Sequence, residues 1–335
     1  MDLSIILLSY NTRTITLQTL QSLDQALTAD SPLNVEVIVV DNASTDGSGE
    51  EIQKLKFKSE NCHLQFIQNK TNEGFSKGNN RGLAVATGNY ILYLNSDMNV
   101  DGLRLSEPVA YMDTHQKVGI VTPRVNLTSG QIDPASHRGF PTPWRSLCYF
   151  SGLESISKKL SALYRGENYS SQVMVSQPAL SSVEGNHDKS HFDRLSVTKI
   201  FGLCMKWFGG YHLLEKDLNV AHEIDACTGA FLLIRGDVVR ELGGFDERFF
   251  MYGEDLDLCY RVKEKGRQVI WLPTQAVIHL KHSSGIGSVS PETRNKIRAH
   301  FYEAMQLFYD KHYRQQYPGI VNSIVRGGIW LKSHI

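Results

Sequence analysis

The 335-residue chain is long enough for one large α/β domain with an insertion, and its 35 Lys plus Arg balance its 35 Asp plus Glu. This zero net charge argues against a general polyanion binder, and we expect no nucleic acid among the partners. The five cysteines include no CxxC pair, which argues against a zinc knuckle or a disulfide framework and favours a reducing compartment.

The N-terminal segment MDLSIILLSYN has no basic region, and its apolar run is too short for a signal peptide or a membrane span. No other stretch reaches the length of a transmembrane helix. The sequence therefore predicts a cytoplasmic protein, with peripheral contact at the inner face of the plasma membrane as an open alternative.

Short apolar runs alternate with helix-like segments through the first part of the chain. Strands are predicted at 3–8, 35–40, 64–69 and 90–95, with helical spacing after the first strand and again around 77–87. Runs that are apolar on both faces are typical of a parallel sheet covered by helices on both sides. We therefore expect a doubly wound, mostly parallel α/β fold.

Polar residues follow each of these four strands. Ser9, Tyr10 and Asn11 follow the first, Asp41 the second, Asn72, Gly74 and Phe75 the third, and Asn95, Ser96 and Asp97 the fourth. In doubly wound sheets ligands bind beyond the carboxyl ends of the strands. We expect these residues to line one binding edge, although each alone also fits a helix cap or a turn.

The segment from 72 to 80, NEGFSKGNN, is rich in Gly and Asn but matches neither GxGxxG nor GxxxxGK[ST]. The absence of these two motifs argues against a nicotinamide-cofactor site and against a P-loop. Gly74 and Gly78 still allow a backbone to approach a ligand at a helix N-terminus.

Asp97 lies two residues after Asn95 at the end of a predicted strand. Residues two apart on an extended chain share a face, so this pair can present oxygens to one Mg²⁺ or Mn²⁺ that also binds a diphosphate. An ordinary Asp-containing turn is the alternative.

Residues 137–222 are rich in Ser and poorly periodic, so we expect an inserted or mobile segment there. Its part at 199–214 mixes Lys with Trp and Phe, and either packs on the core or faces an acceptor or membrane surface. Regular structure resumes with a strand and a helix in 227–244, strands at 268–273 and 276–280, and an amphipathic helix at about 292–312.

Three carboxylates, those of Glu254, Asp255 and Asp257, interrupt the apolar run FFMYGEDLDLCYRV. On a helix that begins near Gly253, Asp255 shares an inward stripe with Leu258, Cys259 and Val262. Asp257 is expected to form an exposed helical ion pair with Arg261, and Glu254 lies in the first turn, where the helix dipole favours an acid.

The chain resembles glycosyltransferase family 2. The motifs that carry the resemblance are SYN at 9–11, DNAS at 41–44, NEGFSKGNN at 72–80, LNSD at 94–97, CTGAFLLIR at 227–235, GGFDERFFMYGEDLDLCYRV at 243–262 and VIHLKHSSG at 277–285. They cover most of 3–135 and 225–312, and the resemblance is closest to the rhamnosyltransferase-like branch that acts on bacterial cell-surface polysaccharide precursors. It implies a GT-A fold and an inverting reaction.

The resemblance also implies roles for single residues. Asp41 and the backbone near Ser9 and Tyr10 would hold the nucleotide base and ribose, with Asn11, Asn72, Gly74, Phe75, Gly78, Asn79, Asn95 and Ser96 completing the nucleotide-sugar site. Asp97 would bind the metal on the donor diphosphate, and His279, or alternatively His282, would be a further metal or diphosphate ligand. Asn95 stands where the family has an acidic residue, and because Asn is a weaker ligand, strict metal dependence stays open.

Asp255 would be the general base that takes the proton of the acceptor hydroxyl, with Glu254 supporting the acceptor or orienting the base. On this interpretation residues 1–136 form the nucleotide-sugar-binding half, 137–222 an acceptor-side insertion, 223–315 the acceptor and catalytic half, and 316–335 a C-terminal tail. The expected donor is dTDP-L-rhamnose or another dTDP- or UDP-linked sugar, and the expected acceptor is a glycan or a polyprenyl-diphosphate-linked sugar.

Two other functions stay open. A sugar nucleotidyltransferase shares a related α/β domain, but it would carry a Gly-rich basic loop after the first strand, where this chain has SYNTRT with Arg13 alone. A non-catalytic nucleotide-sugar-binding homologue would keep the fold without turnover, and Asn95 keeps this alternative open.

Overall fold

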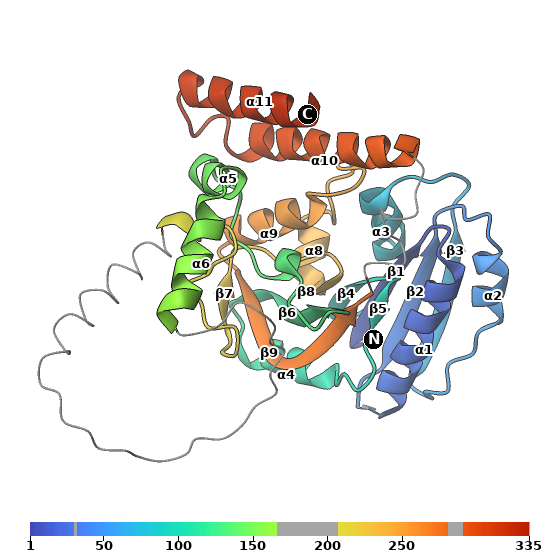
Figure 1. The fold of residues 1–335 in the computed structure, drawn as a ribbon. Coiled ribbons are helices and arrows are strands. Elements are labelled where there is room, and N and C mark those ends of the chain that lie inside the picture. Colours follow the sequence, from blue (N-terminus) through green and yellow to red (C-terminus); the bar gives the residue numbers. More distant parts are fainter. Residues whose placement is uncertain (30–31, 166–206, 281–290, 335) are drawn as a thin grey trace, which may run out of the picture. The chain divides into compact units, whose positions relative to one another are not determined.

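A computed structural model of the chain describes residues 1–29, 32–165, 207–280 and 291–334 (Figure 1). The chain divides into two compact units, one formed by residues 1–137 and 218–335 and the other by residues 138–217. The larger unit carries the whole β-sheet. His282 and residues 199–206, to which the sequence assigned possible roles, lie outside the described residues.

Nine strands of the described residues form one sheet. Its order is β3 (Cys62–Gln68), β2 (Val35–Asp41), β1 (Leu3–Ser9), β4 (Tyr90–Asn95), β8 (Phe231–Arg235), β6 (Val118–Leu127), β9 (Gln268–His279) and β5 (Met98–Asn99), with β7 (His222–Ile224) paired to β9. The first four of these run parallel, as do β6 and β9, while β8, β5 and β7 are antiparallel to their neighbours. The predicted doubly wound, mostly parallel α/β sheet is confirmed.

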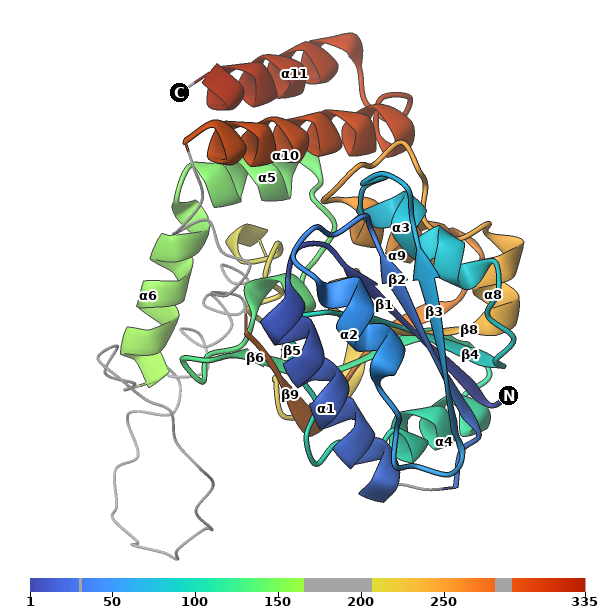
Figure 2. The same cartoon turned by 90° about the vertical axis from the view of Figure 1, so that its right-hand side faces the viewer.

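Helices cover both faces of the parallel strands, as Figure 2 shows for α1 (Arg13–Ala29) and α2 (Ser48–Lys54) on one side. Together with α4 (Ser106–Thr114), they pack on the face that carries Leu3, Ile5 and Leu7 of β1. The opposite face receives α3 (Phe75–Leu83), α8 (Gly236–Glu241) and α9 (Glu254–Glu264). Because successive strand residues point to opposite faces, a strand covered on both sides must be apolar throughout.

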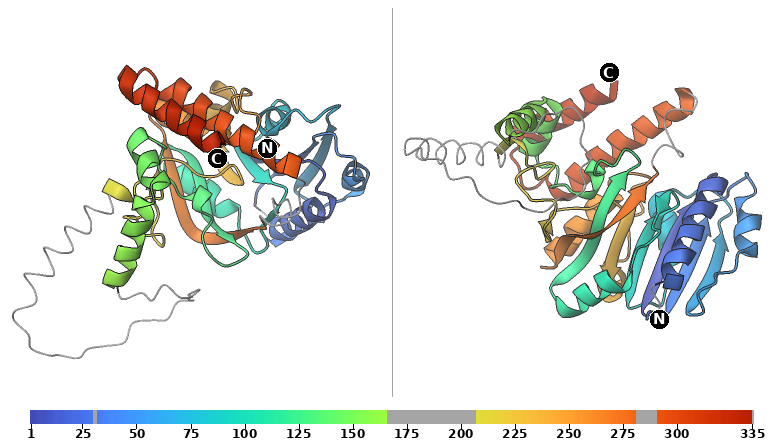
Figure 3. Two further views of the ribbon diagram at one scale, coloured as in Figure 1. Left: turned by 45° about the horizontal axis from the view of Figure 1, so that its top comes forward. Right: turned by 60° about the horizontal axis from the view of Figure 1, so that its bottom comes forward.

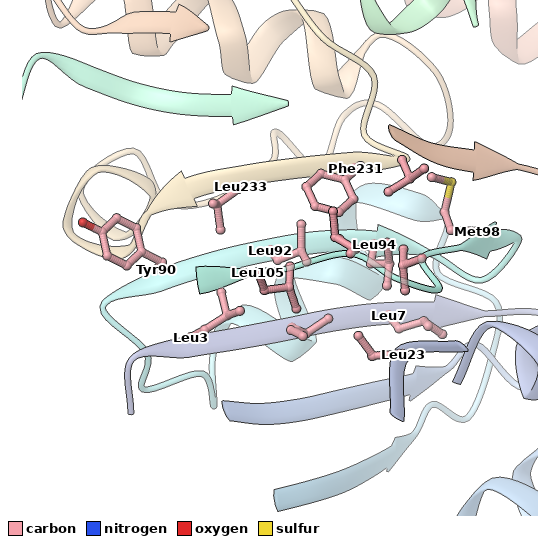
Figure 4. Packing of buried hydrophobic residues seen from close by; sticks show 14 of the residues in the cluster. Leu3, Leu7, Leu23, Tyr90, Leu92, Leu94, Met98, Leu105, Phe231 and Leu233 are labelled. Atoms are coloured by element: carbon pink, nitrogen blue, oxygen red, sulfur yellow. The ribbon is translucent and has the colours of Figure 1, made fainter. Parts of the chain in front are cut away.

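The core on the first face is continuous from β1 through β4 to β8. Figure 4 shows Leu7, Leu92 and Phe231 from these three strands in one cluster with Leu23 of α1, which lies beside Leu7. All four side chains are buried. Burial of a large aliphatic or aromatic side chain stabilises the fold by about 1.5–3 kcal/mol. This packed layer therefore holds the carboxyl ends of the strands in place.

The C-terminal half departs from expectation in two places. The strands predicted at 268–273 and 276–280 are one strand, β9, with an irregular register where Thr122 and Arg124 of β6 pair with Trp271 and Ala276. Proline lacks an N–H, and Pro273 lies within this irregular stretch, which explains why the sequence looked interrupted. The expected C-terminal tail contains a helix, α11 (Gly319–His334), which follows α10 (Pro291–His312).

Helices α10 and α11 lie side by side, as Figure 3 also shows. The hydroxyl of Tyr309 donates to Asn322 Oδ1 (2.7 Å), and Arg326 forms an ion pair with Asp310 (3.2 Å). None of the helices in the described part of the chain combines the length and apolar character that crossing a bilayer requires.

The smaller unit contains α5 (Pro143–Phe150) and α6 (Leu153–Arg165). Thr142 caps α5 through its hydroxyl, which accepts from the N–H of Arg145 (3.3 Å). Glu154 is buried and accepts from the N–H of His212 (2.9 Å). Trp207, from the stretch for which core packing was one alternative, is 60 % exposed.

A buried carboxylate ties the amino ends of β1 and β2 to the loop before β4. Glu36 Oε1 accepts from the hydroxyl of Ser4 (2.6 Å) and from the N–H and hydroxyl of Thr87 (2.7 and 2.8 Å). The Ser4 hydroxyl in turn accepts from the N–H of Gly88 (2.7 Å). Burial alone raises the pKa of Glu36, whereas these hydrogen bonds lower it, and the net result is a pKa below its ordinary value of 4.5.

We predict that Glu36→Gln lowers the free energy of unfolding by about 1.5–3 kcal/mol at pH 7, because hydrogen bonds to a buried charged acceptor are lost. A depressed folded-state pKa gives stability that is complete above the unfolded pKa and is lost as the pH falls through the folded pKa. In urea unfolding the difference in free energy between wild type and variant should therefore be constant from pH 7 to about pH 5 and should narrow as the pH falls further to about pH 3. A difference that stays constant over this whole range would contradict an ionised Glu36.

Candidate active site at the carboxyl ends of the strands

Three predicted site residues end neighbouring parallel strands. Ser9 of β1 pairs in register with Asp41 of β2, and Asn95 of β4 pairs with Leu8, one residue before Ser9. The strand register therefore brings Ser9, Asp41 and Asn95 to one edge of the sheet, as the sequence predicted.

The loop after β1 is held by the loop after β2. The N–H of Asn11 donates to Ser44 Oγ, and Asn11 Oδ1 accepts from the N–H of Thr45, both at 2.8 Å. The Ser9 hydroxyl forms a hydrogen bond with the Thr16 hydroxyl (3.0 Å), so it has a structural role, and its predicted role at the nucleotide stays a prediction. Tyr10 is 46 % exposed, which leaves its ring accessible for stacking on a base.

Asp41 is completely buried. Its Oδ2 accepts from the N–H of Ser44 (3.1 Å), which is the turn role that the sequence left as an alternative. Its Oδ1 is buried and has no hydrogen-bond partner among the described residues. An unpaired buried acceptor costs about 1–3 kcal/mol, and an N–H donor of a ligand would remove that cost.

Asn42 organises the Gly-rich loop, and sequence reasoning assigned it no role. Its amide donates to Asn72 Oδ1 (2.8 Å) and to the Gly74 carbonyl (3.1 Å). Its Oδ1 accepts from Asn69 Nδ2 (2.9 Å) and from the N–H of Glu73 (3.1 Å). The Asn42 side chain therefore both donates and accepts hydrogen bonds. The motif DNAS at 41–44 shapes the Gly-rich loop in addition to ending β2.

Close packing explains the two glycines predicted for this loop. A Cβ at Gly74, which has φ +83°, would lie 2.6 Å from Phe250, and one at Gly78 would lie 2.5 Å from Leu8. Gly78 therefore lets α3 approach β1, and its predicted role near the ligand stays a prediction. The N–H of Phe75 donates to the Phe250 carbonyl (2.6 Å).

Asn79 has a local partner, because its amide donates to the Phe75 carbonyl inside α3 (3.0 Å). Its predicted contact with the nucleotide sugar stays a prediction.

The end of β4 is hydrogen-bonded to the loop before β8. The N–H of Asn95 donates to the Ala230 carbonyl (3.0 Å), and the Ser96 carbonyl accepts from the Thr19 hydroxyl (2.8 Å). Asn95 Oδ1 is buried without a hydrogen-bond partner among the described residues. Like Asp41 Oδ1, it is an acceptor that a ligand or a cation could use.

His279 brings two carboxylates together. Its Nε2 lies 3.2 Å from Asp97 Oδ1 and its Nδ1 lies 2.7 Å from Asp133 Oδ2, and all three residues are buried. Asp133 Oδ1 also accepts from the N–H of Ala135 (3.0 Å), so this carboxylate is fixed from two sides. Sequence reasoning missed Asp133, which precedes Pro134 and reads only as a helix cap.

The donor set suits a divalent cation. Burial alone lowers the pKa of His279, but hydrogen bonds to Asp133 and Asp97 raise it to about 9, so the site attracts positive charge at Nε2. A cation can replace that proton, with Asp97 and His279 as ligands and Asp133 orienting the ring, as carboxylates do behind metal-bound histidines. No group of three His, Cys, Asp or Glu ligands occurs among the described residues, so a bound diphosphate would have to supply further oxygens.

Asp255 points inward from the first turn of α9, as the sequence predicted. It is 8 % exposed, and it accepts from the N–H of Gly229 (Oδ2, 3.1 Å) and the N–H of Leu256 (Oδ1, 2.7 Å). Glu254 is buried beside it. Because Gly229 precedes Ala230, which binds Asn95, a direct chain of contacts links Asp255 to the end of β4.

Asp257 forms the expected ion pair with Arg261 (2.7 Å), but the expectation of an exposed pair is wrong. Asp257 is completely buried, and its Oδ1 also contacts Lys311 Nζ (2.5 Å) and His312 Nε2 (2.8 Å) of α10. Burial alone raises the pKa of Asp257, but its hydrogen bond to His312 and the nearby charges of Arg261 and Lys311 bring the pKa below its ordinary value. The helix periodicity of α9 could not reveal partners on α10.

Left-handed backbone conformations cluster at this edge. Of the non-glycine residues described with positive φ, Asn11 (φ 51°), Ala43 (φ 65°) and Tyr252 (φ 72°) lie in the loops after β1 and β2 and just before α9. Each such residue costs of order 1 kcal/mol, and strain of this kind collects at functional sites.

Two family models match the chain. The model described as glycosyl transferase family 2 matches residues 4–165, and the one described as glycosyl transferase family group 2 matches residues 216–317. Together they cover most of the sequence. The first match includes Ser9, Asp41 and Asp97, and the second includes Asp255 and His279.

Relatives and solved structures agree with these matches. The chain is 33 % identical over 109 residues to an N-acetylglucosaminyl-diphospho-decaprenol L-rhamnosyltransferase of Mycobacterium tuberculosis, a match covering 32 % of this chain and 34 % of that protein. It is 37 % identical over 79 residues to rhamnosyltransferase WbbL of Escherichia coli, covering 23 % and 30 %. The matched segments thus span about a third of the length of these relatives.

A mannosyltransferase from Pyrobaculum calidifontis, solved with GDP-Man and Mn²⁺, has a similar fold, with a TM-score of 0.51 at 14 % identity. The match covers 93 % of this chain and 64 % of that one. At this identity the likeness establishes the fold alone.

We predict that Asp257→Asn lowers the free energy of unfolding by about 3–5 kcal/mol, because it leaves the partly buried charges of Arg261 and Lys311 beside a neutral side chain. Glu264→Gln, a charge removal at an exposed position on the same helix, is the matched control and should change stability by no more than about 0.5 kcal/mol. Chemical unfolding of the two variants measures both values. Similar small effects would mean that the buried cluster contributes little.

Proposed function

The chain belongs to glycosyltransferase family 2, and we propose that it is an inverting glycosyltransferase that transfers a sugar from a nucleotide donor to an acceptor hydroxyl. The observation that carries the proposal is the chain of contacts from Asp255 through Gly229 and Ala230 to Asn95, close to Asp97 and His279. It joins a buried carboxylate base to a candidate cation site. Inverting transfer requires this pairing of a base with stabilisation of the leaving group.

Donor binding would use the loops after β1, β2 and β3. The buried, unpaired Oδ1 of Asp41 suits an N–H of the nucleotide base, and the exposed ring of Tyr10 suits stacking on it. Asp97 and His279 would hold a Mg²⁺ or Mn²⁺, which when bound would neutralise charge on the leaving diphosphate. Asp133 keeps the His279 ring oriented for that role.

Asp255 would act on the acceptor. Its carboxylate takes the proton of the acceptor hydroxyl while that oxygen forms a bond to the anomeric carbon of the sugar. The bond from the anomeric carbon to the diphosphate oxygen breaks, and its electron pair leaves with the nucleoside diphosphate. The backbone N–H groups of Gly229 and Leu256 fix the two carboxylate oxygens, so the base is placed before the acceptor arrives.

The relatives favour a specific donor and acceptor. We propose L-rhamnose from dTDP-L-rhamnose as the donor sugar, and a polyprenyl-diphosphate-linked N-acetylglucosaminyl acceptor of the kind that the M. tuberculosis relative's name states. The product would serve cell-surface polysaccharide synthesis. Such an acceptor resides in a membrane, so we place the reaction at the inner face of the plasma membrane.

Release of free nucleoside diphosphate tests this proposal against its alternatives. A panel of nucleotide sugars with and without Mn²⁺ should give release only when donor and acceptor are both present. A non-catalytic homologue, which Asn95 still allows, would bind donors without release. A nucleotidyltransferase would instead form nucleotide sugars from a sugar phosphate and a nucleoside triphosphate.

We predict that Asp97→Ala removes the Mn²⁺-dependent part of nucleoside diphosphate affinity, weakening binding at least about tenfold in calorimetry with Mn²⁺. Asp101→Ala, an exposed carboxylate a few residues away, should leave the affinity unchanged. Unchanged binding by the Asp97 variant in Mn²⁺ would remove Asp97 from the cation site.

We predict that Asp255→Asn lowers kcat by about 10²–10⁴-fold while donor affinity survives, because Asn keeps the shape but cannot accept the proton. Glu264→Gln removes a charge from the same helix at an exposed position and should keep most activity. Single-turnover kinetics with donor binding measured in parallel separates the two steps. Loss of donor affinity in the Asp255 variant would show a structural or cation-linked role instead.

A further inference from the structure

A groove of about 660 Å³ runs between α10 and α11. Its lining includes the apolar and aromatic side chains of Ala299, Tyr302, Leu307, Ile329 and Trp330. Trp330 is 61 % exposed, although indole is among the most costly side chains to leave in water. An apolar groove of this size is typical of a binding site for an apolar ligand.

A smaller groove of about 240 Å³ adjoins the first, because Glu303 and Leu307 line both. Its other wall is the segment 248–251, which leads directly into α9 and Asp255. Phe250 of this segment stacks on His300 of α10, with ring centroids 4.7 Å apart, and its carbonyl binds the N–H of Phe75 in the donor loop. The two grooves therefore extend from α11 to the edge of the candidate active site.

The composition of α11 indicates where the ligand comes from. The helix contains no Asp or Glu, carries Arg326 and Lys332, and exposes Ile320, Ile324 and Leu331 to solvent. Basic, acid-free helices with an exposed apolar stripe are typical of helices that lie at a membrane surface. A groove beside such a helix is open to a ligand held in a membrane.

We infer that the two grooves bind the isoprenoid chain of a lipid-linked acceptor, an inference that rests on the proposed function. The chain lies between α10 and α11, and the acceptor diphosphate lies at the exposed side of Arg248, whose guanidinium is held at the smaller groove by its ion pair with Asp246 (2.6 Å). The terminal sugar then extends along 248–251 toward Asp255. A water-soluble glycan would leave the apolar lining exposed, so the grooves select an acceptor that carries lipid.

The first test fills the larger groove without disturbing the core. Ala299 is exposed on α10, so Ala299→Phe places a bulky ring in the groove, and Ala84→Phe places the same ring at another exposed position. With N-acetylglucosaminyl diphosphate acceptors on a long polyprenyl chain, Ala299→Phe should raise KM at least about tenfold. KM for the same acceptor on a short chain, KM for the donor, and all values for Ala84→Phe should stay at wild-type level. Equal KM changes for long and short chains, or none, would overturn the inference.

The second test measures binding without transfer. Long-chain polyprenyl phosphate in detergent should change the fluorescence of Trp330 saturably, and this signal should disappear in Ala299→Phe and in Trp330→Phe. If transfer fails with every acceptor but this binding stands, the proposed function is wrong and the groove assignment is supported. If transfer proceeds while Ala299→Phe binds the lipid like wild type, the groove assignment is overturned. The same signal from vesicles without polyprenyl phosphate would also overturn it, in favour of general membrane adsorption.

Discussion

The buried carboxylate of Asp257 is the interaction on which the C-terminal half of the structure depends. It joins Arg261 of its own helix to Lys311 and His312 of α10. Arg261 extends the connection, because its guanidinium donates to the carbonyls of Leu242 (3.0 Å) and Gly244 (2.8 Å) after α8. Asp257 and Arg261 thus fix α9 against α10 and against the loop after α8. Removing the carboxylate would leave its cationic partners uncompensated, and removing those partners would leave the buried carboxylate uncompensated.

The N-terminal half depends on strand register and on one amide. Parallel pairing places the last residues of β1, β2 and β4 at a single edge, and Asn42 then holds the loop after β3 against that edge. Among the contacts between the two halves are two backbone hydrogen bonds near the site, Phe75 to Phe250 and Asn95 to Ala230. Backbone contacts of this kind make the distance between the loop after β3 and helix α9 insensitive to side-chain identity, which suits the two-substrate site proposed here.

The sequence pattern was sufficient to predict the strands and the helix faces, which depend on residues close to one another in the chain. Strands β1, β2 and β4 were predictable because burial on both faces requires continuous apolar runs, and the inward direction of Asp255 follows from helix periodicity. Asp133 was not predictable, because its partner His279 is 146 residues away. The same holds for Asp257 and His312, 55 residues apart. Helix α11 was missed because Gly327 and Gly328 weaken its helical pattern, and it depends on α10 for packing.

Two acids in one helical turn, Asp255 and Asp257, therefore have different environments. Asp257 pairs with Arg261, Lys311 and His312, and these contacts bring its pKa below its ordinary value. Asp255 accepts from the backbone N–H groups of Gly229 and Leu256, which hold the position of its carboxylate. Because Lys311 and His312 belong to α10, the cluster that holds α9 in place also holds the helix that lines both grooves. The position of Asp255 on α9 and the position of α10 beside the grooves thus both depend on the same buried carboxylate.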